Sequence, residues 1–351
     1  MRDIARTGRL VLGPYTERFE AEFAAMVGTR EAVAVSSGTA ALEIVLRYLG
    51  VTGRRVLVPA NAFIAMVVAI QRAGGIPVFV PIDVVSLSAH SAMWSLAGKD
   101  HEGLIVMVMH TAGLIDPTTM ATAAALESLD IPMIEDASHA HGARTMNRLA
   151  GSLGVAGCFS LGATKILTSG GAGGIITTSH PRLAAFARAQ RNHGGLSSDA
   201  VTWQPGEFGY GWLMSEASAA FGVIQLRRLP KMLSRRLEIA DRYRMHLVHG
   251  GSRCQLPPDV GGAAWWKFPV TLASARAHAA IRDGLRDAQI DAGSLYWPSA
   301  FDLVHQEVVG GRTDEMRDIL SRQIALPIHP GMTDEDVSTI CDIVSSSIDL
   351  S

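Results

Sequence analysis

Lysine, cysteine and long apolar runs are scarce in this 351-residue chain, and its net charge is only −2. Three widely spaced cysteines indicate a reducing compartment and no disulfide framework. The small net charge gives no general attraction to nucleic acid or to a membrane, so we expect neither as a partner. The longest apolar stretch, LIVMVM before His110, is too short to cross a bilayer, and the N-terminus lacks the apolar core of a signal peptide. We therefore expect a cytoplasmic protein.

Apolar residues make up 48% of the chain and charged residues 18%, which predicts a sizeable core. The length accommodates two domains of about 100–200 residues each. We place a large domain at residues 13–226 and a small C-terminal domain at residues 227–351.

Short apolar segments in the first half of the chain have the composition of buried strands. They lie at 32–35, 55–59, 77–80, 104–109, 131–136, 156–160 and 173–178. Helical patterns lie between or after them, near 64–73, 86–96, 117–129 and 181–191. Apolar strands that alternate with helices predict an α/β fold with a mostly parallel seven-stranded sheet covered by helices. A further strand and two helices, at 267–272, 274–288 and 333–344, predict a smaller C-terminal α/β domain.

Lys165 is the most distinctive of only four lysines in the chain. It follows Ser160, the last residue of an apolar run, inside a loop rich in serine and glycine. Another apolar run ends in the carboxylate of Asp136. Pyridoxal phosphate needs an amine that forms a Schiff base and a carboxylate that keeps its ring nitrogen protonated. The pattern favours Lys165 as that amine; the alternative is a surface lysine on a flexible loop.

The other three lysines fit this role less well. Lys99 lies in a polar turn and Lys231 in a run of arginines, where solvation is the ordinary role. Lys267 lies in the predicted strand at 267–272, so it is the one alternative that could point inward.

Residues 36–39 follow the first predicted strand and open a helix. The free N–H groups and the dipole of a helix start attract an anion such as a phosphate, although a simple N-cap explains the same residues. Ligands bind beyond the carboxyl ends of parallel strands. Because Ser37, Phe63, His110 and Asp136 all lie at or just after strand ends, they indicate one common site.

Five motifs occur in one order along the chain: SSGTAAL, IEDASHAHGA, CFSLGATKILTSGGAGG, RNHGG and ALPIHPGMTDEDV. Together they resemble the DegT-type sugar aminotransferases, a branch of the fold-type-I pyridoxal phosphate enzymes, from about Gly13 to Val337. The resemblance implies an aspartate-aminotransferase-like large domain, pyridoxal 5'-phosphate as the cofactor, and a homodimer in which the partner subunit completes each site.

The resemblance also implies roles for individual residues. Lys165 and Asp136 are the expected catalytic residues, as proton shuttle and as partner of the ring nitrogen. Phe63 is expected to stack on the cofactor and His139 to contact its face or ring hydroxyl; each could instead be an ordinary core residue. The expected cofactor-binding residues are Gly38, Thr39, Phe63, Asp136, His139, Ser160 and Lys165. Nearby histidines lack a compact ligand spacing, so we expect no metal.

Three departures from the family pattern concern substrate and phosphate contacts. An Asn that reaches the neighbouring subunit's phosphate is replaced by Gly211, an Arg by Leu213, and the glycine loop after the lysine is altered at residues 170–173. The expected function is transfer of an amino group from Glu or Gln to a keto sugar, nucleotide sugar or cyclitol. The alternatives are another pyridoxal phosphate reaction, such as dehydration or elimination, and a non-catalytic, cofactor-bound regulator.

Overall fold

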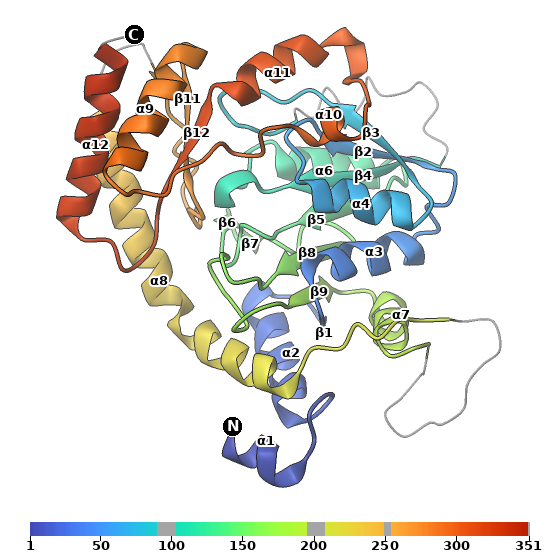
Figure 1. Cartoon of the computed structure of the whole chain (residues 1–351). Helices are drawn as coiled ribbons and strands as arrows, with labels where there is room; N and C mark the ends of the chain where they lie inside the picture. Colours follow the sequence, from blue (N-terminus) through green and yellow to red (C-terminus); the bar gives the residue numbers. More distant parts are fainter. Residues whose placement is uncertain (90–102, 195–207, 249–253, 350–351) are drawn as a thin grey trace.

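The computed structural model describes residues 1–89, 103–194, 208–248 and 254–349. Its centre is a seven-stranded sheet of order β1-β9-β8-β5-β4-β2-β3 (Figure 1). The strands are β1 (Glu31–Val35), β2 (Arg55–Pro59), β3 (Ile76–Val80), β4 (Ile105–Met109), β5 (Met133–Asp136), β8 (Ala156–Ser160) and β9 (Gly174–Thr178). All neighbours pair in parallel except at β9, which is antiparallel to both β1 and β8. The predicted mostly parallel seven-stranded sheet is confirmed.

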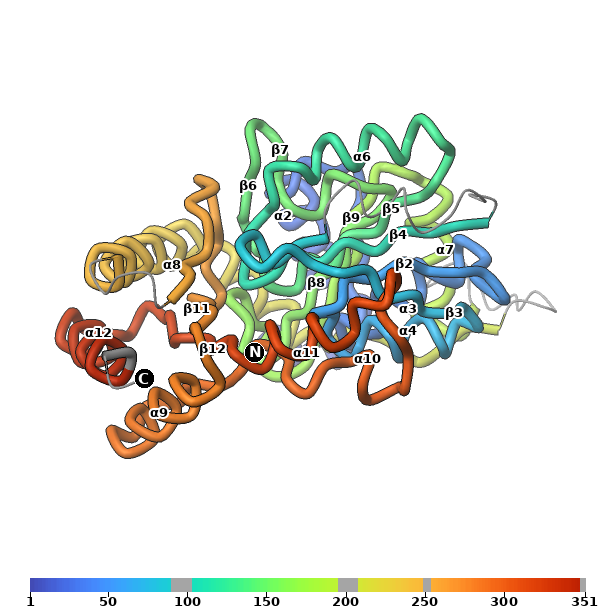
Figure 2. The backbone as a smooth tube through the Cα atoms, turned by 90° about the horizontal axis from the view of Figure 1, so that it is seen from above, coloured from blue at the N-terminus to red at the C-terminus, as the bar shows by residue number. Residues whose placement is uncertain are grey.

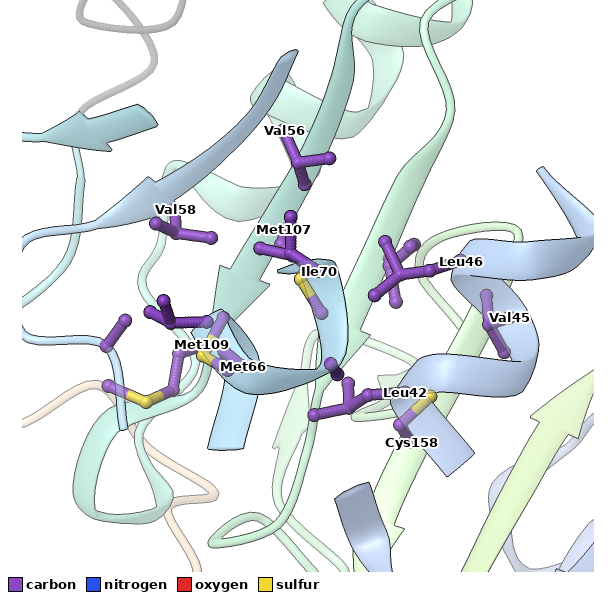
Figure 3. Packing of buried hydrophobic residues seen from close by; sticks show 14 of the residues in the cluster. Leu42, Val45, Leu46, Val56, Val58, Met66, Ile70, Met107, Met109 and Cys158 are labelled. Carbon is purple, nitrogen blue, oxygen red and sulfur yellow. The ribbon is translucent and has the colours of Figure 1, made fainter. Parts of the chain in front are cut away.

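Helices cover both faces of this sheet, so its strands are buried on both sides. One apolar cluster joins the sheet to α3 (Gly38–Tyr48), α4 (Ile64–Arg72) and α7 (Pro181–Arg191). Figure 3 shows Leu42 and Leu46 of α3 and Met66 and Ile70 of α4 gathered with Met107 of β4. A second cluster joins the other face to α2 (Pro14–Val27), α6 (Thr119–Glu127) and the start of α8.

Helix α8 (Glu216–Val248) runs for 33 residues from the large sheet to the C-terminal region. There a three-stranded antiparallel sheet is formed by β10 (Cys254–Gln255), β11 (Phe268–Leu272) and β12 (Gln323–Leu326). Helices α9 (Ala275–Asp287) and α12 (Asp334–Asp349) pack with it into a third apolar cluster. Figures 1 and 2 both show this unit beside the large sheet. The division predicted at residue 227 falls within α8 and stays a prediction.

Part of the C-terminal region returns to the large sheet. Helices α10 (Ala300–Leu303) and α11 (Thr313–Ser321) contribute to the apolar cluster of α3 and α4. Phe301 packs edge-on against Phe79 of β3, with ring centres 5.8 Å apart. The two parts of the chain are therefore joined by side-chain packing as well as by α8.

The remaining elements are short. They are α1 (Arg2–Thr7), the hairpin β6 (Arg144–Thr145) and β7 (Arg148–Leu149), and the 3-10 turns η1 (Thr111–Gly113) and η2 (Val309–Gly311). Of the helix expected near 86–96, residues 86–89 form turn and irregular backbone, and the remainder lies outside the described residues. Lys99 also lies outside them. Within the described ranges, no helix is both long and apolar enough to cross a membrane.

Candidate active site

Asp136 is the last residue of β5, at the edge where the parallel strands of the large sheet end. Its side chain is buried, with 4% exposure, and its Oδ1 accepts a hydrogen bond of 3.0 Å from the Ser138 N–H. One carboxylate oxygen is thereby held by the backbone of the following turn. A buried carboxylate fixed in this way can keep a proton on a basic ring nitrogen placed beside it.

Ser160 ends β8, two positions along the sheet order from β1, and the start of α3 packs directly against it. A Cβ atom on Gly38 would lie 2.9 Å from the Ser160 Cβ, so only glycine permits this approach. The Ser37 hydroxyl caps the helix by accepting from the Ala40 N–H at 3.1 Å. A candidate phosphate-binding site therefore lies here. It consists of the remaining N–H groups of this first turn, around Thr39, and the Ser160 hydroxyl.

The loop after β8 turns back on itself and presents Lys165. Its backbone N–H donates to the Gly162 carbonyl at 3.0 Å, and Gly162 forms an isolated bridge with Gly171. The Lys165 side chain is half-buried. Burial lowers the pKa of its ammonium below the ordinary value, while the Asp136 carboxylate opposes that shift. Lys165 and Asp136 therefore lie near enough for their charges to interact.

Aromatic rings surround the Lys165 ammonium. Its Nζ lies 4.6 Å from the Trp266 ring centre and 6.0 Å from that of Phe63, whose side chain is 43% exposed. Tyr296 packs against Phe63, with ring centres 5.2 Å apart. The site is therefore lined by three rings: Phe63 precedes α4, and Trp266 and Tyr296 come from the C-terminal region.

His139 is buried beneath these rings. Its imidazole stacks on Trp266 with ring centres 3.8 Å apart and planes 5° from parallel, and its Nε2 shares a short hydrogen bond with the Tyr296 hydroxyl. Burial, followed by the positive charge of Lys165, lowers the pKa of His139 well below its ordinary value. The ring is therefore neutral near pH 7 and can exchange a hydrogen bond without carrying charge.

Trp266 and Tyr296 belong to the site although the sequence does not predict them there. Trp266 lies just before β11, and its ring N–H donates to the Thr164 carbonyl at 2.8 Å. Tyr296 has a positive φ of 62°, a backbone conformation that a tyrosine seldom adopts. In the sequence, Trp266 is marked only by the paired tryptophans of AWWKFPV, and Tyr296 only by the aromatic residue next to it. Aromatic residues in these positions are equally compatible with an ordinary core.

His110, which is expected near the site, and Glu135, which the sequence does not mark, both have structural roles. His110 Nε2 pairs with the buried Glu135 carboxylate at 2.8 Å. Glu135 also accepts backbone N–H groups of the loop before β8, from Gly151, Leu153 and Gly154. The two adjacent carboxylates therefore have different roles. Glu135 stabilises the loop before β8, whereas Asp136 interacts with the charge of Lys165.

Lys267, the alternative amine, faces a different set of charges. It is half-buried, and burial lowers the pKa of its ammonium, with Asp291 opposing and Arg236 reinforcing that shift. Across the described residues, no group of three or more His, Cys, Asp or Glu side chains could hold a metal ion.

The segment with the family departures pairs with the end of α7. Asn192 bridges Gly211, and a Cβ atom on Gly211 would lie 3.2 Å from Cε1 of His193. The His193 imidazole therefore covers the space that a side chain at position 211 would enter. Met214 of the same segment lies near the glycines that follow Lys165, since a Cβ atom on Gly173 would be 3.1 Å from its Cε.

These residues fit pyridoxal 5'-phosphate. The cofactor requires an amine for a Schiff base, a carboxylate beside its ring nitrogen and a site for its phosphate. One edge of the sheet supplies a half-buried amine, a buried carboxylate and a helix start that Gly38 brings close to Ser160. The fold and the site define a pyridoxal phosphate enzyme of fold type I. Comparison with known proteins gives the particular family.

The sequence profile of the DegT/DnrJ/EryC1/StrS aminotransferase family matches residues 1–345. The chain belongs to this family, and it is a pyridoxal-phosphate-dependent aminotransferase. That membership favours the aminotransferase interpretation over the elimination and regulator alternatives.

Similar proteins cover nearly the whole chain. A spore coat polysaccharide biosynthesis protein, SpsC of Bacillus subtilis, is 30% identical over 96% of this chain and 90% of its own length. A GDP-perosamine synthase of Escherichia coli O157:H7 is 29% identical over 95% and 90%. Among solved structures, DesV of S. venezuelae, in complex with a ketimine intermediate, is 27% identical with a TM-score of 0.90, over 99% of this chain and 93% of that one.

Proposed function

We propose that this aminotransferase moves an amino group from glutamate or glutamine to the keto group of a sugar, nucleotide sugar or cyclitol. Natural-product or cell-surface glycan biosynthesis is the proposed setting. Two relatives support a sugar-related acceptor, since one is named for GDP-perosamine and the other for spore coat polysaccharide. Within the structure, the proposal depends most on one observation: Lys165 lies among Asp136, Phe63 and Trp266 at the carboxyl edge of the sheet.

Each residue of this site has a proposed task. When bound, pyridoxal phosphate supplies an electron-accepting ring that makes the donor's α-proton acidic. Asp136 holds a proton on the ring nitrogen through its buried carboxylate. Ser160, Gly38 and Thr39 hold the phosphate, and His139 contacts the ring hydroxyl or face.

Lys165 is the proposed attachment point of the cofactor and the proton carrier. Its amine has a lowered pKa because it is half-buried, and Asp136 keeps that shift from being larger. A general base is most effective when its pKa lies near the working pH. The free amine can therefore take the α-proton of the donor and return it to the neighbouring carbon.

The donor carboxylate needs a cationic or hydrogen-bonding partner, and the family arginine is Leu213 here. Asn192, His193 or an arginine within residues 227–351 is the proposed replacement. A lost charged hydrogen bond costs about 1.5–3 kcal/mol. We expect a raised donor requirement with turnover retained.

A homodimer is also proposed, with the partner subunit completing each site. Exposed apolar side chains at the start of α8, Phe221 at 41% and Ile224 at 57% exposure, support it. Phe221 lies next to the lysine loop, since a Cβ atom on Gly170 would be 3.4 Å from its ring. Light scattering should give a dimer mass for the wild type and a monomer for Phe221→Asp; an active wild-type monomer would refute the dimer.

The test of the proposed reaction is a spectral titration with donor alone. L-glutamate or L-glutamine should convert the bound cofactor slowly but completely to its pyridoxamine form, without any acceptor. Lys165→Ala serves as the unreactive control. If no common amino acid converts the cofactor while its absorption band persists, the proposed half-reaction is wrong.

A further inference from the structure

The segment that carries Trp266 is fixed to the turn after β4. The Trp266 backbone N–H donates to the Ala112 carbonyl at 2.8 Å, and the Ala264 N–H donates to the Gly113 carbonyl at 2.9 Å. Gly113 has a φ of 93°, and a Cβ atom there would lie 2.8 Å from the Trp265 nitrogen. Glycine at position 113 therefore permits a close approach that holds residues 264–266 against the large sheet.

Arg236 of α8 fixes the same segment from another side. Its buried guanidinium donates to the carbonyls of Trp265 at 2.9 Å and of Ile328 at 2.6 Å. The backbone that supports the Trp266 side chain is thus hydrogen-bonded to β4's turn, to α8 and to the segment after β12. A side chain on so constrained a backbone has little freedom to move.

The Trp266 side chain meets the lysine loop in two ways. Its Nε1–H donates to the carbonyl of Thr164, the residue before Lys165, at 2.8 Å. Its ring centre lies 4.6 Å from Lys165 Nζ, within the range of a cation–π contact. Stacking on His139 fixes the orientation of the indole plane.

Three kinds of group face the Lys165 amine: a carboxylate, two imidazoles and two aromatic rings. Asp136 favours the ammonium form, whereas burial and any charge on His139 or His141 disfavour it. Both histidines are buried with lowered pKa values, so they are neutral near pH 7. The rings of Trp266 and Phe63 favour the ammonium, and Trp266 lies closer. Trp266 is therefore the uncharged group best placed to offset burial.

We infer that Trp266 is a positioning residue for Lys165: its indole stabilises the protonated amine when Lys165 is free and holds the loop that presents it. This inference rests on the proposed role of Lys165 as the proton carrier. Burial alone would favour the neutral amine, which can take a proton but has none to return to a reaction centre. The π face of Trp266 and the carboxylate of Asp136 together keep that proton at Nζ.

Competitive acetylation of the lysines tests this inference without measuring turnover. The full chain, freed of cofactor, is labelled with trace acetic anhydride over a range of pH, and each lysine's labelling midpoint is read by peptide mass mapping. Wild type, Trp266→Leu and Trp266→Phe are compared. Lys231, which is exposed on α8, serves as the reference, and Lys267 reports any general opening of the segment.

The Lys165 midpoint should fall by about 1 pH unit in Trp266→Leu and by clearly less in Trp266→Phe, which keeps a ring but lacks the N–H donor. The Lys267 midpoint should stay unchanged in both. An unchanged Lys165 midpoint in Trp266→Leu would overturn the inference, as would an equal fall in Trp266→Phe or a matching shift of Lys267. These outcomes concern the amine alone, so they are independent of whether donor titration supports the proposed reaction.

Discussion

The carboxyl edge of the large sheet and the segment before β11 contribute to one site in different ways. The sheet edge supplies Asp136 and Ser160, each the last residue of its strand, and their positions follow from the parallel pairing of neighbouring strands. The segment before β11 supplies Trp266, held by hydrogen bonds to η1 and α8. The Asp136 carboxylate and the Ser160 hydroxyl therefore come from strand ends and Lys165 from the loop after β8, whereas the Trp266 ring comes from irregular backbone.

The two regions should therefore respond differently to substitution. A change at the sheet edge should remove a reacting group or the hydrogen bonds of a strand end. A change among the rings should alter the protonation and orientation of groups that remain present. The largest effects are therefore expected at the sheet edge and its loop, and the smallest among the rings.

Replacement of Lys165 should have the largest effect. Lys165→Ala removes the only amine that faces Asp136 among the described lysines, so it should abolish the cofactor's imine absorption and the donor half-reaction. Lys231→Ala, at an exposed position on α8, should leave both unchanged. Absorption spectra of the two purified variants provide the measurement, and an unchanged Lys165→Ala spectrum would contradict the assignment.

The neighbouring carboxylates Asp136 and Glu135 should separate function from stability. Asp136→Asn should keep the fold but slow turnover on the order of 10²–10³-fold, a scale typical of losing one group that stabilises charge in the reaction. Glu135→Gln should instead lower the free energy of unfolding by about 3 kcal/mol, because a buried partner of His110 and of three backbone N–H groups is weakened.

Urea unfolding and steady-state kinetics on both variants check this pair of expectations. The proposed separation of roles is wrong if Asp136→Asn lowers the free energy of unfolding as much as Glu135→Gln does. It is also wrong if Glu135→Gln loses turnover while its free energy of unfolding is unchanged. Adjacent positions in one strand make the two variants matched controls for each other.

His141 should make the protein sensitive to acid. Burial lowers its pKa to about 3, whereas the unfolded chain binds that proton near the ordinary value. The unfolded state therefore holds more protons below about pH 6.5, and stability falls as pH falls, by up to about 1.4 kcal/mol per pH unit. His141→Phe should remove this contribution, while His246→Phe, at an exposed position, should not. Equal acid slopes for wild type and His141→Phe in urea unfolding would refute it.

Tyr296→Phe should have the smallest effect. It keeps the ring against Phe63 but removes the hydroxyl that bonds His139 Nε2. One lost hydrogen bond is worth about 1 kcal/mol, so the cofactor Kd should rise about fivefold with little change in stability. Fluorescence titration of cofactor-free protein measures the Kd; a rise beyond about a hundredfold would show that the hydroxyl has a direct chemical role.

Much of the large sheet could be predicted from local sequence. The strands at 55–59 and 156–160 and the helix at 181–191 coincide with β2, β8 and α7, because apolar runs and flanking turn residues mark them. No local pattern predicts that β9 runs antiparallel to its neighbours, because an apolar strand has the same composition in either orientation. The helix expected near 86–96 is absent from its described part, residues 86–89.

Some residues of the site can likewise be predicted from local sequence, and others cannot. Lys165, Asp136 and Ser160 carry local signals, because a strand end followed by a polar or glycine-rich turn is visible in the sequence. Trp266 reaches Thr164 across 102 residues and Tyr296 reaches His139 across 157. Contacts over such separations depend on how the C-terminal region packs, which no local pattern specifies.

Lys165 is the proposed amine that binds the cofactor at the edge of the large sheet. Borohydride reduction of the holoenzyme, followed by peptide mapping, identifies this amine, because reduction fixes the cofactor to whichever lysine holds it. We expect the label on Lys165 and none on Lys231 or Lys267. A label on Lys267 would contradict this expectation and would place the chemistry on the C-terminal region instead.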